Sequence, residues 1–345
     1  MQRVTRYEAV GRRLAHDVTQ VVPGMSKRVY LRRGDVVGRE HLETLGDMGK
    51  EHLVVLDGDE APSGEVHEND AARLLAHAAA GDGTRAGDPV EGKCDVAAAV
   101  DGLFTADVAR VDATNERFAG QAALITRPSG VPVRAGDRVG IARVYPAYLP
   151  GEAAERLAEV GTALQVAAFR AHRAAVVVTG AEVAAGRVTD AFGPLLGEKL
   201  AAFGSTVASV KVVADDADAI AATIRSAAQA ADLVFVTGGM AVDADDVTQS
   251  AIRRAGVDVR FAGVPMQPAT LLLFGTLGTV ALFGVPAGVL YDKTSALDRL
   301  LPFVLAGHLP TAAEVLRMGV GGMLAAAGHG HAAPAGSGVP GGRAR

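Results

Sequence analysis

The chain has no tryptophan, one cysteine and few aromatic residues, which make up 4% of its 345 residues. A single cysteine, Cys94, excludes an internal disulfide and fits a reducing compartment. No apolar run reaches the roughly 18 residues that a membrane-spanning helix needs. The N-terminus also lacks the apolar core of a signal peptide. We therefore expect a cytoplasmic protein with no membrane partner.

Positive charge is also scarce, because 34 Lys and Arg face 39 Asp and Glu and give a formal net charge of −5. The sequence shows no basic footprint of the kind that nucleic-acid binding requires, so we expect no nucleic-acid partner. The length exceeds that of one ordinary domain and predicts two or three.

The most informative stretch runs from residue 231 to residue 248. Residues 233–236 have the length and branching of a buried strand, and Thr237-Gly238-Gly239 follows. A glycine turn lets backbone amides approach an anion. Three acids and a threonine come next: Asp243, Asp245, Asp246 and Thr248. Carboxylates beside an anion site indicate a divalent cation between them, although an acidic helix start explains them equally well.

Two further strands end at the same kind of signal. Residues 174–178 run into Thr179-Gly180 and Glu182, and Thr189 or Asp190 can cap a helix over 191–203. Residues 207–213 lead to Asp215 and a helix over 217–230. This β-α-β-α-β order predicts an α/β fold with a doubly wound, mainly parallel sheet. Ligands bind at the carboxyl ends of such strands, where four acids are expected: Glu182, Asp190, Asp215 and Asp246.

Residues 174–307 resemble the molybdopterin-binding domain of the MoeA, MogA and gephyrin proteins of molybdenum-cofactor biosynthesis. The matching pieces are Thr179-Gly-Ala-Glu182, Gly186-Arg-Val-Thr-Asp190, Val213-Ala-Asp-Asp216, Thr237-Gly-Gly239, Asp246-Val-Thr248 and Phe283-Gly-Val-Pro286. The short bacterial MoeA-like proteins also match the first half, through Val10-Gly-Arg-Arg-Leu-Ala-His-Asp17, Leu45-Gly-Asp-Met-Gly-Lys-Glu-His-Leu53 and Gly64-Glu-Val-His-Glu68.

The resemblance implies molybdopterin, or its adenylylated form, as ligand, with Mg²⁺ and molybdate as a substrate. It implies a catalytic role for Glu182, Asp215 and Asp246, and metal binding by Asp243 and Asp246. The implied cofactor-binding residues are Thr179, Gly180, Asp190, Thr237, Gly238, Gly239, Thr248 and Pro286. It also implies a homo-oligomer.

The family's motifs are not all present. A Pro-Gly-Lys-Pro turn is replaced by Pro265-Met-Gln-Pro268, and Gly-Leu-Pro-Gly-Asn-Pro is replaced by Gly284-Val-Pro-Ala-Gly-Val289. The resemblance makes a molybdotransferase-like enzyme, which inserts molybdate into adenylylated molybdopterin, the leading hypothesis. The alternatives are a non-enzymatic carrier that hands the finished cofactor to an apo-molybdoenzyme, and a CinA-like nucleotide pyrophosphatase. The last usually has Gly-Pro where this chain has Ala241-Val242.

The predicted organisation has five parts. An α+β module over 1–88, with a helix over 40–48 and a strand over 51–56, precedes a small β-rich module over 89–150. Asn69 or Asp70 is expected to cap a helix that ends near Ala80. A linking helix is predicted over 151–173, and the molybdopterin-binding domain over 174–312, with its last long helix at 292–305. Residues 313–345 are predicted to be a mostly disordered tail.

Overall fold

The computed structural model describes residues 1–22, 26–56, 64–240 and 247–322 of the chain. Its residue contacts divide the chain into two compact units, Met1–Ala168 and Phe169–Arg345. No helix in these described ranges is both long enough and apolar enough to cross a bilayer.

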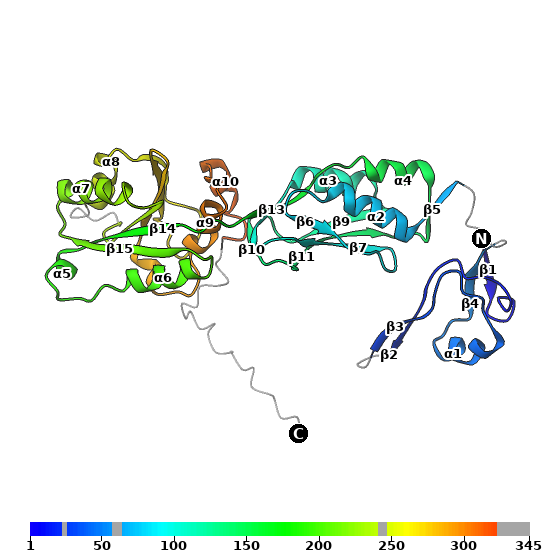
Figure 1. Cartoon of the computed structure of the whole chain (residues 1–345). Helices are drawn as coiled ribbons and strands as arrows, with labels where there is room; N and C mark the ends of the chain where they lie inside the picture. Colours follow the sequence, from blue (N-terminus) through cyan, green and yellow to red (C-terminus); the bar gives the residue numbers. More distant parts are fainter. Residues whose placement is uncertain (23–25, 57–63, 241–246, 323–345) are drawn as a thin grey trace, which may run out of the picture. The chain divides into compact units, whose positions relative to one another are not determined.

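Residues 1–22 and 26–56 of the first unit form small antiparallel sheets (Figure 1). They share one apolar cluster. Strand β1 (Gln2–Thr5) pairs with β4 (His52–Val55), and β2 (Val18–Val22) pairs with β3 (Ser26–Leu31). Between them lie η1 (Arg39–His41) and α1 (Leu42–Asp47). The predicted helix over 40–48 and strand over 51–56 are therefore confirmed.

The remainder of this unit is rich in antiparallel strands, as predicted for 89–150. A four-stranded sheet has the order β6 (Thr84–Ala86), β7 (Lys93–Ala98), β11 (Arg138–Val144), β9 (Ala122–Thr126). A three-stranded sheet has the order β10 (Val131–Val133), β8 (Gly102–Ala106), β13 (Leu164–Ala168), and β12 (Tyr148–Pro150) pairs with β5 (Glu65–His67). The helices are α2 (Glu68–Ala79), α3 (Val108–Arg117) and α4 (Gly151–Ala158).

Two elements of this unit differ from the prediction. The linking helix over 151–173 is wrong beyond Ala158, because β13 follows and pairs antiparallel with β8. Gly161, with φ of +73°, lies between the two, and the side chains of Leu164 and Val166 alternate into the core. The expected cap of α2 is also wrong, since His67 Nδ1 accepts the Asn69 N–H at 3.2 Å.

The second unit is built on one six-stranded sheet. Its order is β15 (Thr206–Val213), β14 (Arg173–Thr179), β16 (Leu233–Thr237), β19 (Val280–Val285), β18 (Leu273–Leu277), β17 (Asp258–Ala262). The first four strands are parallel, and β18 and β17 extend the sheet antiparallel. The predicted α/β fold with a mainly parallel sheet is confirmed.

Helices cover both faces of this sheet (Figure 1). Residues of α6 (Phe192–Ala201) and α9 (Ala296–Leu305) share one apolar cluster with Val176 and Val178 of β14. Residues of α7 (Ala217–Ala228) and α8 (Thr248–Arg254) share another with Ala175 and Val177. This alternation reflects the two-residue period of a strand that is buried on both faces.

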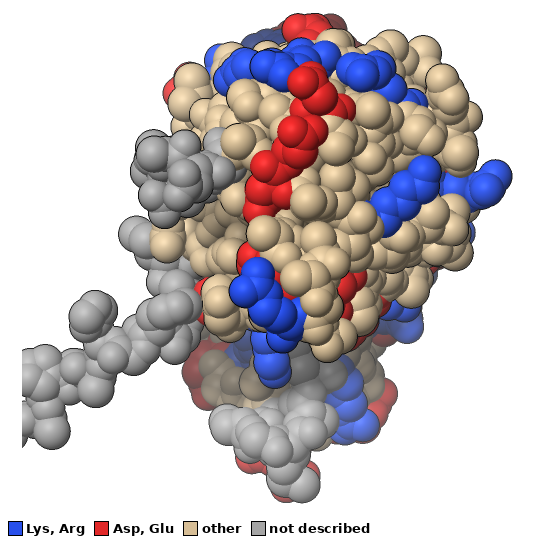
Figure 2. Space-filling view, turned by 90° about the vertical axis from the view of Figure 1, so that its left-hand side faces the viewer, with Lys and Arg blue, Asp and Glu red and all other residues tan. Residues whose placement is uncertain are grey.

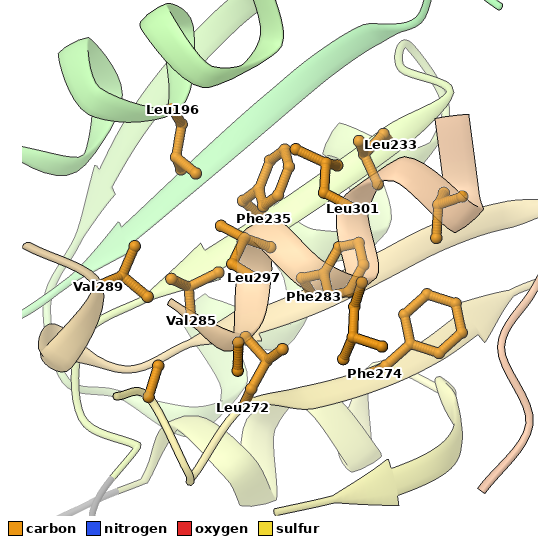
Figure 3. Close-up of a cluster of buried hydrophobic side chains, with 14 of the residues drawn as sticks. Leu196, Leu233, Phe235, Leu272, Phe274, Phe283, Val285, Val289, Leu297 and Leu301 are labelled. Atoms are coloured by element: carbon orange, nitrogen blue, oxygen red, sulfur yellow. The ribbon is translucent and has the colours of Figure 1, made fainter. Parts of the chain in front are cut away.

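Figure 3 shows the first of these clusters, where side chains from the sheet and from both helices meet. The rings of Phe235 and Phe283 stack with their centroids 5.8 Å apart. This tight packing between neighbouring parallel strands holds the carboxyl ends of β16 and β19 in a fixed relation.

The end of the chain departs from the prediction in two places. Helix α9 begins at Ala296 and not at Asp292, because Ser295 and Asp298 form a capping box there. A further helix, α10 (Ala312–Arg317), overlaps the start of the stretch 313–345 that was predicted to be a mostly disordered tail. The remainder of that predicted tail, from residue 323, lies outside the described residues.

Candidate functional site

A cleft of about 680 Å³ lies at the carboxyl ends of the parallel strands of the second unit. This is the position where ligands bind in open α/β sheets, and its size suits a small molecule. Its wall includes most of the residues that the sequence pointed to: Thr179, Gly180, Glu182, Asp190, Asp215, Gly238, Gly239, Thr248 and Pro286. Segments more than a hundred residues apart in the chain therefore meet in one site.

The two glycine turns lie side by side because β14 and β16 are paired in parallel, with Val178 opposite Thr237. Gly238 has φ of +123°, and a Cβ built there would lie 2.1 Å from Thr179 Oγ1 and 2.6 Å from Thr179 O. Only glycine fits this approach. The close contact between the two turns is therefore enough to require glycine at position 238, whether or not a ligand binds.

Thr179, at the first glycine turn, contacts Thr248, which lies beyond the second glycine turn in the chain. Their hydroxyl oxygens lie 3.0 Å apart, and both residues are buried, with exposed fractions of 3% and 1%. This hydrogen bond connects the end of β14 to the first turn of α8. Thr237, by contrast, does not line the cleft, and its buried hydroxyl has no hydrogen-bond partner among the described residues.

Asp215 shapes the turn after β14. Its Oδ2 accepts a hydrogen bond of 2.8 Å from the N–H of Ala181, the first residue of the short helix α5 (Ala181–Ala184). Asp215 follows β15, and β15 lies next to β14 in the sheet. The carboxylate of Asp215 therefore reaches the turn that follows the neighbouring strand. The structure therefore gives this residue a positioning role in addition to its place in the cleft wall.

The side chain of Asp190 binds the start of α6, as the sequence predicted, although the N-cap position itself is Ala191. Its Oδ1 accepts the N–H of Phe192 at 2.8 Å, and its Oδ2 accepts the N–H of Gly193 at 3.0 Å. Both carboxylate oxygens are thus engaged with backbone at the helix start. Glu182 lies in α5 and Pro286 follows β19, and both line the same cleft.

The charge of the cleft is negative. Three carboxylates line it, from Glu182, Asp190 and Asp215, while no Lys, Arg or His belongs to the part of the lining that the structure describes. Within the described ranges, no three His, Cys, Asp or Glu residues come together as a metal site. Asp243, Asp245 and Asp246 lie outside the described residues, so the predicted metal ligands Asp243 and Asp246 stay a prediction.

Sequence reasoning missed the apolar wall of the cleft. That wall includes Val188, Phe192, Leu271, Leu290 and Tyr291. Tyr291 follows η2 (Ala287–Leu290), just beyond the end of β19, and so its place at the carboxyl edge was a usable signal. Leu271 comes from the loop between β17 and β18, and no motif in that loop marks it.

Figure 2 shows the side of the second unit that carries α5. Acidic side chains form a band across a surface that is otherwise mostly uncharged, and basic side chains lie toward its margins. This distribution agrees with the cleft lining, in which carboxylates are the only charged groups that the structure describes.

The fold and the cleft define a ligand-binding α/β domain whose site lies where two parallel strands end in Thr-Gly turns. Residues 175–315 match the family model described as a probable molybdopterin binding domain, which confirms the resemblance inferred from the sequence. Residues 3–57 match the model of a domain of unknown function.

Several solved structures are similar to this chain. The protein CinA with unknown function from Thermoplasma acidophilum is 23% identical, with 35% of this chain and 90% of that chain covered and a TM-score of 0.32. The molybdopterin biosynthesis Mog protein from Mycobacterium ulcerans is 23% identical, with coverages of 39% and 93% and a TM-score of 0.31. The molybdopterin biosynthesis moea protein from Pyrococcus horikosii is 16% identical, with coverages of 92% and 74% and a TM-score of 0.31. No curated protein matches the chain.

Proposed function

We propose that the cleft binds molybdopterin or its adenylylated form, and that the protein acts in molybdenum-cofactor biosynthesis. The observation that carries this proposal is the meeting of the Thr179-Gly180 and Gly238-Gly239 turns in one cleft, inside a domain that matches the molybdopterin-binding model. Backbone amides at such turns suit a phosphate group.

Because the cleft is negatively charged, binding of a phosphate group there requires a cation. A phosphate next to the carboxylates of Glu182 and Asp215 would be repelled, since the described part of the lining has no positive side chain. Mg²⁺ removes that repulsion and takes carboxylate and phosphate oxygens as ligands. We therefore propose Mg²⁺-dependent binding, with Glu182, Asp215 and the sequence-predicted Asp243 and Asp246 as candidate ligands.

The proposed reaction resembles that of the molybdotransferases: molybdate is inserted into adenylylated molybdopterin and AMP leaves. The metal would neutralise the phosphate and stabilise the leaving group. The residues of this chain would do the positioning. Asp215 holds the backbone of the turn after β14 through the N–H of Ala181. The hydrogen bond between Thr179 and Thr248 holds the start of α8 against the same turn. Such fixed geometry is what a group transfer requires of its site.

The test is anaerobic incubation of the full chain with adenylylated molybdopterin, molybdate and Mg²⁺, followed by chromatography of the nucleotides. We expect AMP release that depends on protein, on molybdate and on Mg²⁺. AMP release equal to that of a protein-free control would contradict the molybdotransferase function.

The second candidate is a carrier that binds the cofactor and hands it to an apo-molybdoenzyme. The cleft favours it in one respect, because the lining that the structure describes offers no cationic side chain to a departing phosphate. Pro265-Met-Gln-Pro268 likewise has no lysine where the related enzymes carry one. Tight binding of the cofactor without AMP release would support the carrier.

A further inference from the structure

One side chain of the apolar wall has no structural partner in the part of the chain that the structure describes. Tyr291 is 77% exposed although it lines the cleft, and its ring and hydroxyl make no ring contact or hydrogen bond with any described residue. Two other described tyrosines are exposed, Tyr7 at 63% and Tyr145 at 51%, and both lie outside the cleft. Packing and folding therefore do not account for the position of Tyr291.

Two more exposed apolar residues line the same cleft as Tyr291. Leu271 is 39% exposed and Val188 is 52% exposed, and both line it. Single exposed apolar residues are normal on a protein surface. Three exposed apolar residues in one cleft that also has polar groups are typical of a small-molecule site with an apolar wall.

The backbone under this wall is firmly held. A Cβ built at Gly288 of η2 would lie 3.4 Å from Ala269 N, so the loop that carries Leu271 packs closely against the segment that carries Tyr291. The N–H of Ala296 also donates to the carbonyl of Pro268. Val289, between Gly288 and Tyr291, is fully buried in the core beneath. Tyr291 is thus an exposed ring on a rigid support.

We propose that Tyr291, on the same cleft wall as Leu271, forms a stacking surface for the planar heterocycle of the ligand, while the glycine turns hold the phosphate end. This inference rests on the proposed function. The surface suits a flat nitrogen heterocycle, which is present in the pterin and in the adenine of an adenylylated form. An aromatic ring next to a heterocycle stacks through its π-face and needs no hydrogen bond for it.

The absence of tryptophan from the chain makes a direct test available. The variant Tyr291→Trp has one tryptophan, whose emission should be quenched when a heterocycle stacks on it. The matched control is Tyr145→Trp, whose tryptophan lies outside the cleft. The full chain is titrated with 6-carboxypterin and, separately, with AMP, in the presence of Mg²⁺. We expect saturable quenching of the first variant and none of the second.

Affinity provides the second readout. Tyr291→Phe keeps the ring and should bind molybdopterin about as the wild type does, while Tyr291→Ala should bind at least about ten-fold more weakly. Quenching by 6-carboxypterin assigns the surface to the pterin, and quenching by AMP alone assigns it to the adenine. Either result supports a stacking surface.

Two results would overturn the inference. If wild type and Tyr291→Ala bind molybdopterin equally and the emission of Tyr291→Trp does not change, the stacking surface is wrong and the proposed function stands. If the wild type binds neither molybdopterin nor either probe and no quenching occurs, the stacking surface and the proposed function are both wrong. Quenching by AMP or 6-carboxypterin without molybdopterin binding supports the surface and rejects the proposed ligand.

Discussion

The hydroxyl of Thr179, at the end of β14, is hydrogen-bonded to the hydroxyl of Thr248, at the start of α8, over 3.0 Å and across 69 residues of sequence. Both side chains are buried, so the bond is shielded from water. It ties together the two segments that form the polar end of the cleft. The stability of the site and its ability to hold a ligand are therefore linked at this point.

Thr179→Val should lower the free energy of unfolding by about 1 kcal/mol, because it removes one member of a buried hydrogen bond. Thr237→Val is the matched control in the neighbouring strand. The Thr237 hydroxyl is buried and has no partner among the described residues, so the methyl group should leave the protein unchanged or stabilise it by up to about 1 kcal/mol. Urea unfolding of both variants measures this difference. An equal loss in both would contradict the assigned bond.

Gly238→Ala should be severely destabilising, by about 3 kcal/mol or more, because it combines a strained φ with a collision against the Thr179 backbone. Gly197→Ala is a suitable comparison, since Gly197 lies in α6 and, among the described residues beyond its own stretch of helix, no atom lies within 4 Å of the position that the new methyl group would take. That variant should gain about 0.5–1 kcal/mol of stability. Thermal melting distinguishes the two. If the melting temperature of Gly238→Ala equals that of the wild type, the two turns do not approach each other closely.

Variants of Asp215 separate the effect of its hydrogen bond to Ala181 from the effect of its negative charge. Asp215→Asn keeps an oxygen that can accept the N–H of Ala181, so its melting temperature should equal that of the wild type. It removes the negative charge, so Mg²⁺-dependent binding of molybdopterin should weaken at least about ten-fold. Asp215→Ala should lose both stability and binding. Unchanged binding by Asp215→Asn would reduce the role of this residue to the hydrogen bond alone.

His67 makes the first unit sensitive to acid. Burial lowers the pKa of His67 from its ordinary value of 6.5 to about 4, and the nearby Arg33 acts in the same direction. The unfolded chain therefore binds the proton more tightly than the folded chain. The contribution of His67 to stability is complete above about pH 6.5 and falls as the pH drops toward 4, by about 3 kcal/mol in total.

Unfolding by urea at pH 7 and at pH 4.5 tests this dependence. His67→Phe keeps a ring against Tyr148 and removes the titration, so it should lose about 2 kcal/mol less than the wild type between the two pH values. The lost hydrogen bond to Asn69 lowers stability equally at both. His52→Phe, at an exposed position, should behave as the wild type does. If the wild type and His67→Phe lose the same free energy of unfolding between pH 7 and pH 4.5, His67 is not a buried neutral histidine.

Local sequence signals predicted the parallel sheet and much of the cleft because they depend on neighbouring residues. An apolar run that ends in Thr-Gly marks both the strand and its carboxyl end, as at Thr179 and Thr237. Asp190 could be identified as a cap because its partners are two and three residues away.

The features that the sequence could not predict depend on contacts between distant segments. The partner of Asp215 is a backbone group 34 residues away, and the collision at Gly238 involves a different strand. The helix predicted beyond Ala158 failed because residues 164–168 gain a partner strand, β8, that only the tertiary fold supplies. Tyr291 belongs to no motif. Its place beyond the end of β19 was a usable signal, but its exposure in the cleft is visible only in the structure.

The central claim is that the cleft at the ends of β14 and β16 binds molybdopterin. Ala287 is an exposed residue of the cleft wall, and Ala222 is an exposed residue of α7 outside it. The most direct test is anaerobic equilibrium dialysis of molybdopterin, with Mg²⁺, against the wild type, Ala287→Phe and Ala222→Phe. We predict saturable binding to the wild type and to Ala222→Phe, and affinity at least about ten-fold lower for Ala287→Phe, whose ring fills the cleft. Equal affinity in all three proteins, or no binding to any of them, would contradict the claim.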